Sequence, residues 1–304
     1  MIAEHKARGS IRRGPPAIEL MFATVAISAV GLFPKLIHGD AFALTFGRAL
    51  FGSLALLALA QWRRASLKVD RKDYGPFLLI SIFGAVNWAG YFAAIKVAGV
   101  SVAVVSLFTF PLLAAILEPW VQRERHDRFE LFAGLAVVVG VFFVVPEFNI
   151  HNRTTDGVLL GTLAALCFTL RNVFGRRLVQ EYGAVNCMTW QFLAATLMFT
   201  PFGVPWILRW TALDWLLLFV IGAVLTASSQ TIFFANLRRV SASYASLLTS
   251  AQPVITVAMA MVWLGEKPTL RTLIGGAIVT ASVVAVAIRK RPAAPTWDTG
   301  EITT

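Results

Sequence analysis

Charge is scarce in this chain. Only 14% of its 304 residues are charged, whereas an ordinary soluble domain has about 25%. Hydrophobic residues make up 57%, and the mean hydropathy is +0.71. A soluble fold of this length needs more polar surface, so the composition excludes a soluble enzyme and a disordered chain. It predicts a polytopic membrane protein.

Cysteine and catalytic patterns are also sparse. The two cysteines, Cys167 and Cys187, both have apolar neighbours, which argues against a disulfide scaffold. All aspartates and histidines fall in expected loops or tails, no zinc-ligand pattern occurs, and no phosphate-binding loop is present. We therefore expect no metal, no cofactor and no enzymatic activity.

Long apolar runs dominate what is there. A spanning helix needs about 20 mostly apolar residues, and helices satisfy their own backbone groups in lipid. The sequence predicts an all-α membrane protein with ten transmembrane helices. The expected spans are residues 17–37, 41–61, 74–95, 100–120, 131–146, 157–176, 185–208, 213–235, 241–264 and 272–288.

Lysine and arginine predict the orientation of these spans. With the N-terminus in the cytoplasm, 19 basic residues fall on the cytoplasmic side and 6 on the other, while Arg48 and Arg171 lie inside spans. This positive-inside bias predicts a multi-pass protein of the bacterial inner (plasma) membrane with both termini cytoplasmic. It also explains the net charge of +11 without a nucleic-acid partner.

The chain repeats itself once. A shift of 142 residues places Pro111 on Pro253 and Glu124 on Glu266, and each half contains five spans. Because five is odd, the second half must enter the membrane in the opposite sense, which predicts two inverted five-helix repeats. The expected parts are a cytoplasmic N-terminal arm (1–16), the first repeat (17–146), a periplasmic linker (147–156), the second repeat (157–288) and a cytoplasmic tail (289–304).

Two prolines mark corresponding places in the two halves. Pro111 and Pro253 both fall near the expected middle of the membrane. Proline removes a backbone donor and breaks or bends a helix. Paired helix breaks point to a central site and to gating there, although prolines are also common in membrane helices.

Motifs in the second half resemble a known family. The stretch 242–248 leads to Gln252 and Pro253, and the Leu-Gly-Glu at 264–266 is followed by the glycines at 275–276. This pattern is similar to that of EamA-type members of the drug/metabolite transporter superfamily, although the first half has Gln122–Arg125 where Leu-Gly-Glu is typical. The resemblance implies ten helices, a central cavity and alternating access, with the fifth and tenth helices bracing the outside.

Arg48 and Arg171 are the strongest candidates for a binding site. An ionisable group inside a membrane is costly and normally faces a cavity or a partner. Either guanidinium could bind a carboxylate or phosphate through two parallel hydrogen bonds. The alternatives are a structural bridge for Arg48 and snorkelling to the interface for Arg171.

Other polar residues could line the same cavity. Asn87, Trp88 and Tyr91 share one face of the third span, and Asn172 follows Arg171. Gln191 and Gln252 lie inside the seventh and ninth spans, and all of these side chains could instead serve helix packing. Glu118 is a possible proton carrier, or an ion-pair partner of Arg123 or Arg125.

These patterns favour a secondary transporter that moves a small organic solute across the lipid membrane. The solute is expected to be an amino acid or a related amphipathic metabolite, and outward transport is implied by the resemblance alone. The alternative function is a non-transporting membrane subunit or lipid-handling protein, in which Arg48 and Arg171 would contact headgroups.

Overall fold

A computed structural model describes residues 16–122, 128–144, 152–229, 232 and 251–289. All regular structure in these ranges is helical. Six of the described helical segments are long and apolar enough to cross a membrane, and four more are apolar but shorter. The expectation of an all-helical chain is confirmed for the described residues, and their lengths and composition agree with a membrane protein.

The first half of the chain contains seven α-helices and two short 3₁₀ turns among its described residues. They are α1 (Pro16–Ala29), η1 (Val30–Leu32), α2 (Phe33–Leu36), α3 (Ala41–Trp62), η2 (Arg71–Asp73), α4 (Tyr74–Ala98), α5 (Val100–Leu107), α6 (Phe110–Gln122) and α7 (Arg128–Val144).

Fewer residues of the second half are described. Its elements are α8 (Arg153–Tyr182), α9 (Ala184–Ile207), α10 (Ala212–Phe219), the π-helix η3 (Val220–Ala227), α13 (Gln252–Trp263) and α14 (Leu270–Arg289). The first part of the expected ninth span, residues 241–250, lies outside the described residues.

Local chemistry explains where several helices begin. The Asp40 carboxylate accepts hydrogen bonds from the backbone N–H groups of Phe42 and Ala43, which caps α3. Between α4 and α5 the chain turns at Gly99 with a φ of 92°, a value that L side chains rarely adopt. The chain can therefore turn with a single residue between α4 and α5.

Three expected spans are interrupted. The first changes from α1 to the 3₁₀ turn η1 at Val30 and resumes as α2 at Phe33. The fourth divides into α5 and α6 between Leu107 and Phe110, so Pro111 occupies the first turn of α6, where its missing N–H is harmless. The eighth changes from α-helix to π-helix at Val220, a feature that apolar composition does not predict. Helix α8 is longer than the expected span 157–176, because it extends from Arg153 to Tyr182.

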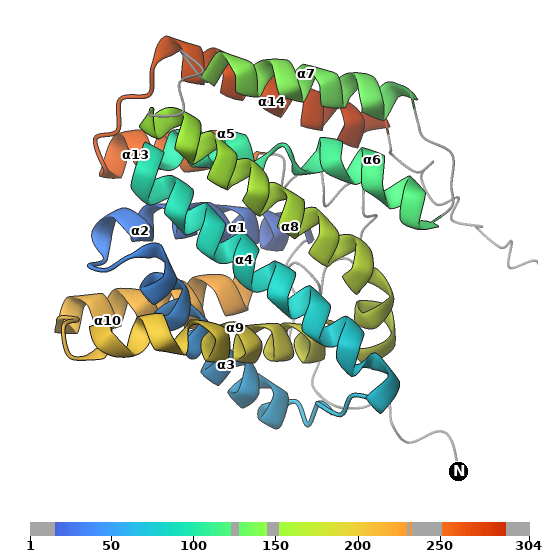
Figure 1. Cartoon of the computed structure of the whole chain (residues 1–304), viewed down its shortest axis with the longest axis vertical. Coiled ribbons are helices and arrows are strands. Elements are labelled where there is room, and N and C mark those ends of the chain that lie inside the picture. The colour runs from blue at the N-terminus through green and yellow to red at the C-terminus, as the bar shows by residue number, and fades with distance from the viewer. Residues whose placement is uncertain (1–15, 123–127, 145–151, 230–231, 233–250, 290–304) are drawn as a thin grey trace, which may run out of the picture.

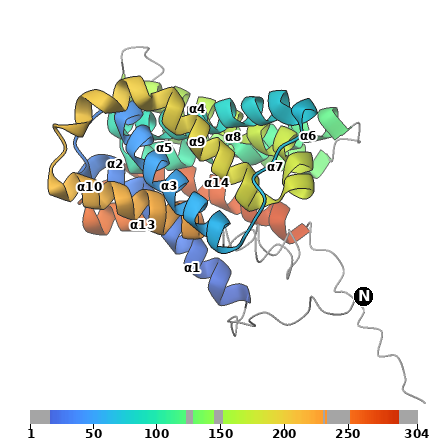
Figure 2. The ribbon, with the colours of Figure 1, turned by 90° about the horizontal axis from the view of Figure 1, so that it is seen from below.

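Pairs of helices from different halves form the body of the molecule. Helix α4 packs along α8, α3 along α9, and α7 along α14 (Figure 1). The pair α7–α14 lies at one edge and α3, α9 and α10 lie at the opposite edge, which is the edge nearer the viewer when the molecule is seen from below (Figure 2). The largest buried side chains include Phe92 of α4 and Phe192 of α9.

Glycines allow the closest of these contacts. Gly140 of α7 and Gly275 of α14 face one another so closely that a Cβ on either would lie within 2.8 Å of the other's carbonyl oxygen. Gly157 of α8 likewise leaves no room for a Cβ beside Ala98. Small residues therefore let the backbones approach, as is typical of helix pairs in membranes.

Candidate functional site

Arg48 lies in the interior, where α3, α4 and η3 meet. Its side chain is buried, with only 4% of the residue exposed. The Nε–H donates a hydrogen bond to Thr226 Oγ1 at 3.1 Å, and the guanidinium carbon lies 4.9 Å from the Trp88 ring centroid and 5.4 Å from that of Phe92. Aromatic faces attract a cation, so this environment partly compensates the loss of water.

Arg171 of α8 lies close to the same tryptophan. It is also buried, and its guanidinium carbon lies 6.0 Å from the Trp88 centroid and 5.4 Å from that of Phe168. The structure therefore brings the two predicted arginines to one indole. Among the described residues no carboxylate lies within 4.0 Å of either guanidinium.

Gln191 of α9 completes this cluster. It is 2% exposed, and its Oε1 has no hydrogen-bond partner among the described residues. Its amide and Arg171 meet over Gly84, where a Cβ would lie 3.1 Å from Gln191 Oε1 and 3.2 Å from Arg171 Cδ. The adjacent Phe192 ring lies 4.4 Å from Trp88, centroid to centroid. We call Arg48, Trp88, Arg171, Gln191 and Thr226 the central cluster.

Thr226 is the member of the central cluster that was not expected from the sequence. Its hydroxyl donates to the carbonyl of Ile221, five residues earlier, at 2.6 Å and accepts from Arg48. The donation spans the five-residue spacing of the π-helix, so this turn points the hydroxyl at α3. A Cβ at Gly222 would lie 2.5 Å from the Arg48 carbonyl oxygen, so the glycine permits the close approach.

The remaining predicted site residues have varied surroundings. Asn87 donates to the Ala164 carbonyl oxygen of α8 at 2.8 Å, a helix-packing contact. Tyr91 is half-buried, with its hydroxyl beside Gly31. Asn172 is exposed although Arg171 is buried, because adjacent helix positions face different directions.

Four predicted residues are not part of the central cluster. Gln252 and Pro253 lie on α13, and Pro111 and Glu118 lie on α6. Gln252 is half-buried at the start of α13, and its carbonyl oxygen accepts from Ser28 of α1 at 3.5 Å. Pro253 is buried in the first turn of the same helix. The Glu118 side chain lies outside the described residues.

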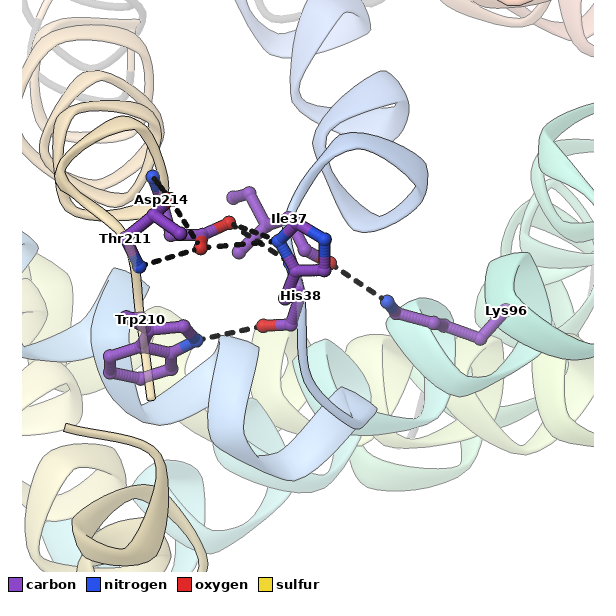
Figure 3. A network of polar contacts seen from close by, with 6 residues as sticks. All are labelled: Ile37, His38, Lys96, Trp210, Thr211 and Asp214. Carbon is purple, nitrogen blue, oxygen red and sulfur yellow. Dashed lines mark hydrogen bonds and ion pairs between the residues drawn. The ribbon is translucent and has the colours of Figure 1, made fainter. Parts of the chain in front are cut away.

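A polar network closes one end of the α3–α9 pair (Figure 3). The buried Asp214 carboxylate accepts from the His38 backbone N–H at 3.0 Å, and His38 Nδ1 lies 3.1 and 3.2 Å from its two oxygens. It also accepts from the N–H and hydroxyl of Thr211, and Trp210 Nε1 donates to the His38 carbonyl oxygen at 2.7 Å. Lys96 donates to the neighbouring Ile37 carbonyl oxygen at 3.1 Å. We call this the His38–Asp214 network.

A second polar network lies at the other end of α3. The Asp73 carboxylate is buried, accepts from Tyr182 Oη at 2.6 Å and pairs with Arg177 Nη2 at 2.9 Å. We call this the Asp73–Tyr182 network. In the same region Asn186 Nδ2 donates to the carbonyl oxygens of Ser66 and Lys68. These contacts tie the α3–η2 segment to α8 and α9.

Glu266 connects α13 to the start of α5. Its Oε1 accepts from the Val100 N–H at 2.7 Å, while Oε2 accepts from the N–H and the hydroxyl of Ser101 at 3.0 and 2.6 Å. The carboxylate therefore satisfies backbone donors that the first turn of a helix leaves free. Its place in the sequence suggests a role at the end of its own span, whereas in the structure it caps a helix of the other half.

The arrangement is suited to binding rather than to bond chemistry. Among the described residues, one group of three acids has its carboxylate oxygens within 4.8 Å of one another, as metal ligands would: Asp70, Asp73 and Glu181. Lys72 and Arg177 pair with these acids, so most of the negative charge of the group is already balanced. The central cluster instead offers guanidinium donors, an amide and an aromatic face, all on buried side chains.

Comparison with known proteins decides the family. The sequence profile of the EamA-like transporter family matches residues 16–145 and again residues 155–288. The chain belongs to the EamA-like transporter family. Members of this family and the relatives of the chain are transporters rather than enzymes, which agrees with the expectation from the sequence.

Two relatives illustrate the likeness. An uncharacterized transporter of Archaeoglobus fulgidus is 24% identical over 274 residues, covering 90% of this chain and 96% of the relative. The threonine/homoserine exporter RhtA of Escherichia coli is 25% identical over 291 residues, covering 90% and 93%. Both likenesses extend over nearly the whole chain and both relatives are transporters.

A solved structure has the same fold. A crystal structure superimposes with a TM-score of 0.62 at 17% identity, covering 91% of this chain and 98% of the solved one. At this identity the likeness concerns the arrangement of helices alone.

Proposed function

We propose that the chain is a secondary transporter that exports a small organic solute, an amino acid or related amphipathic metabolite, by alternating access. The solute binds at the central cluster, between the two arginines and beside Trp88. The observation that carries this proposal is the meeting of Arg48, Arg171 and Gln191 around one buried indole in a family of transporters. Export is supported by the exporter activity of the Escherichia coli relative.

Ten spans arranged as two inverted five-helix repeats fit the contacts. The family profile matches twice, and the described chain contains ten apolar helical segments in the order expected. Under the shift of about 140 residues, α3 and α7 correspond to α9 and α14, and each of the two packs against its own counterpart. An axis through the middle of the membrane would produce such self-pairing.

Individual residues follow the same symmetry. Arg48 is seven residues beyond the start of α3, and Gln191 is seven residues beyond the start of α9. The two helices are antiparallel, since Phe42 near the start of α3 stacks on Phe199 near the end of α9. Gly222 lies close against Arg48, and Gly84, which is 138 residues earlier in the sequence, lies close against Gln191. Arg48 and Gln191 would therefore approach the centre of the membrane from opposite sides.

The two polar networks are also counterparts. Asp214 bonds His38 at one end, and Asp73 bonds Tyr182 at the other, with sequence shifts of 141 and 144 residues between corresponding members. In the orientation predicted by the basic residues, the His38–Asp214 network is periplasmic and the Asp73–Tyr182 network is cytoplasmic. Alternating access then requires each network to open in turn while the other stays closed.

The alternative function, a lipid-handling protein, has one observation in its favour. An apolar hollow of about 560 Å³ lies beside α7 and α14, lined by Val138, Val139, Phe142 and Phe143, with Arg271 among its lining residues. An acyl chain fits such a lining and a basic side chain suits a lipid headgroup. This hollow lies beside α7 and α14, whereas Arg48 belongs to α3, which lies toward the opposite edge of the molecule (Figure 1). The two functions therefore predict different essential residues.

Cysteine accessibility tests the transporter proposal and needs no identified solute. Cys167 and Cys187 are replaced by alanine, and single cysteines are placed at Arg48 and Gln191. Membrane-impermeant thiol reagents are then applied to vesicles from either side. Alternating access predicts that both positions react from both sides, because water reaches the central cluster in each state.

Matched controls lie on the same helices. Leu54 of α3 and Leu197 of α9 are exposed on the outer surface of the protein, 53% and 74% respectively. In lipid their cysteine variants should stay unreactive, because a thiolate does not form in hydrocarbon. Protection of Arg48→Cys and Gln191→Cys from both sides, or reaction of each from one side alone, contradicts the proposal and favours a protein that does not transport.

A further inference from the structure

The charge balance of the central cluster bears on the solute itself. Arg48 and Arg171 are buried, and both guanidinium carbons lie within 6.0 Å of the same indole centroid. Two like charges held near one another in a medium of low dielectric repel strongly. Contacts with aromatic faces stabilise a cation by less than the free energy lost when its charge is buried.

The protein supplies little negative charge to balance them. The buried acids that the structure describes, Asp73 and Asp214, lie at the two ends of the helices and already bond Arg177, Tyr182, His38 or Thr211. The sequence from 233 to 250, which lies outside the described residues, contains no aspartate or glutamate. In the described residues the central cluster therefore carries an uncompensated charge of about +2.

Several hydrogen-bonding groups of the central cluster also lack partners among the described residues. Arg48 uses its Nε–H on Thr226, which leaves the terminal amino groups of its guanidinium for another acceptor. Within the described part of the chain, the Arg171 guanidinium is engaged by aromatic faces, and Gln191 Oε1 is a buried acceptor without a donor. A ligand that completes these contacts has acidic oxygens for both arginines and an N–H or O–H group for Gln191.

We propose that the solute is an organic anion with two acidic groups, one for each guanidinium, and a hydrogen-bond donor that reaches Gln191. This inference rests on the proposed transport function and narrows its substrate class. A zwitterionic amino acid would leave one arginine without a counter-charge. A hydroxylated or aminated dicarboxylate satisfies the open donors and the open acceptor of the central cluster.

Ligand-dependent thermal stability of the purified full-length protein in nanodiscs tests the charge class. The probes are L-malate, succinate, L-aspartate and L-threonine at equal concentrations and fixed ionic strength. We expect malate and aspartate to raise the melting temperature most, succinate less because it lacks the donor for Gln191, and threonine least. Equal or greater stabilisation by threonine overturns the inference, and so does the absence of stabilisation by every dicarboxylate.

Variants locate the binding. Arg48→Gln and Arg171→Gln should each weaken malate binding at least tenfold, because each removes one bidentate pair. Arg48→Lys keeps the charge but loses the fork, so it should bind with intermediate affinity. Arg209→Gln is the control, since that guanidinium stacks on Trp206 near the end of α9 and belongs to no part of the central cluster. Unchanged malate affinity in both Arg48→Gln and Arg171→Gln also overturns the inference.

Glu118→Gln separates charge supplied by the protein from charge supplied by the solute. If Glu118 already neutralises the central cluster, its removal should convert a threonine preference into a malate preference, which would refute the inference. The cysteine accessibility experiment decides the proposed function independently. Counterflow in proteoliposomes driven by threonine and not by malate leaves transport standing and refutes the solute with two acidic groups.

Discussion

Replacing Asp214 with asparagine should destabilise the protein by about 2–4 kcal/mol. Both oxygens of this buried carboxylate are in use: Oδ1 accepts from the His38 N–H, and Oδ2 accepts from the N–H and hydroxyl of Thr211. An amide has one oxygen, so its NH₂ group must face a backbone donor in either orientation. A hydrogen bond to a charged group contributes about 1.5–3 kcal/mol, and a charge at a helix N-terminus adds about 0.3–1 kcal/mol.

Asp40 provides a matched control a few residues away. Its Oδ1 alone accepts the two described N–H groups, from Phe42 and Ala43, so asparagine can keep both bonds. Asparagine and aspartate are comparable N-caps, and we expect Asp40→Asn to change the stability by about 0.5 kcal/mol or less. The two substitutions are chemically identical, so any difference between them reports how each carboxylate is bonded.

The buried cysteines make the measurement direct. Cys167 is 7% exposed and Cys187 is fully buried, so a thiol-reactive fluorophore responds as the protein unfolds on heating. Asp214→Asn should lower the melting temperature by about 5–10 °C, whereas Asp40→Asn should leave it nearly unchanged. Equal shifts in the two variants would refute the argument from the two bonded oxygens of Asp214. No shift in Asp214→Asn would show that the His38–Asp214 network contributes nothing to stability.

Three further predictions use the same fluorophore. Asp73→Asn should cause a loss similar to that of Asp214→Asn, and the two losses should add in the double variant because the networks are remote; strong non-additivity contradicts this. Glu266→Gln should lower the melting temperature, since one of its two oxygens ceases to accept from the first turn of α5, and an unchanged value refutes the cap. Gly222→Ala should destabilise by at least about 1–3 kcal/mol because its Cβ meets the Arg48 carbonyl oxygen, whereas Gly75→Ala, with open space around it, should not; equal effects refute the close approach.

Helix positions could largely be predicted from the sequence, because hydrocarbon thickness fixes the length of an apolar run. The expected spans 41–61 and 185–208 correspond to α3 (Ala41–Trp62) and α9 (Ala184–Ile207) within one residue. The π-helix η3 could not be predicted in this way, because its spacing depends on a hydroxyl bond and on contact with α3. Apolar composition is the same for either helix type.

The candidate site was predicted in part. Arg48 and Arg171 are conspicuous because a charge inside a span demands a reason. Their common neighbour Trp88 and the partner Thr226 depend on how separate helices pack, which one sequence does not reveal. Thr211 and Asp214 form a capping box that the spacing Thr-x-x-Asp could have indicated, but the bond to His38 joins residues 176 positions apart.

The bond between Arg48 and Thr226 has a consequence for the order of events during synthesis. Thr226 is made 178 residues after Arg48, so the second span must leave the ribosome and enter lipid long before its hydroxyl partner exists. The indole of Trp88 arrives only 40 residues later and is the earliest of the described neighbours to shield the nascent cation. During biogenesis the N-terminal half is therefore made and inserted while Arg48 still lacks its hydrogen-bond acceptor, which belongs to the C-terminal half that has not yet been synthesised.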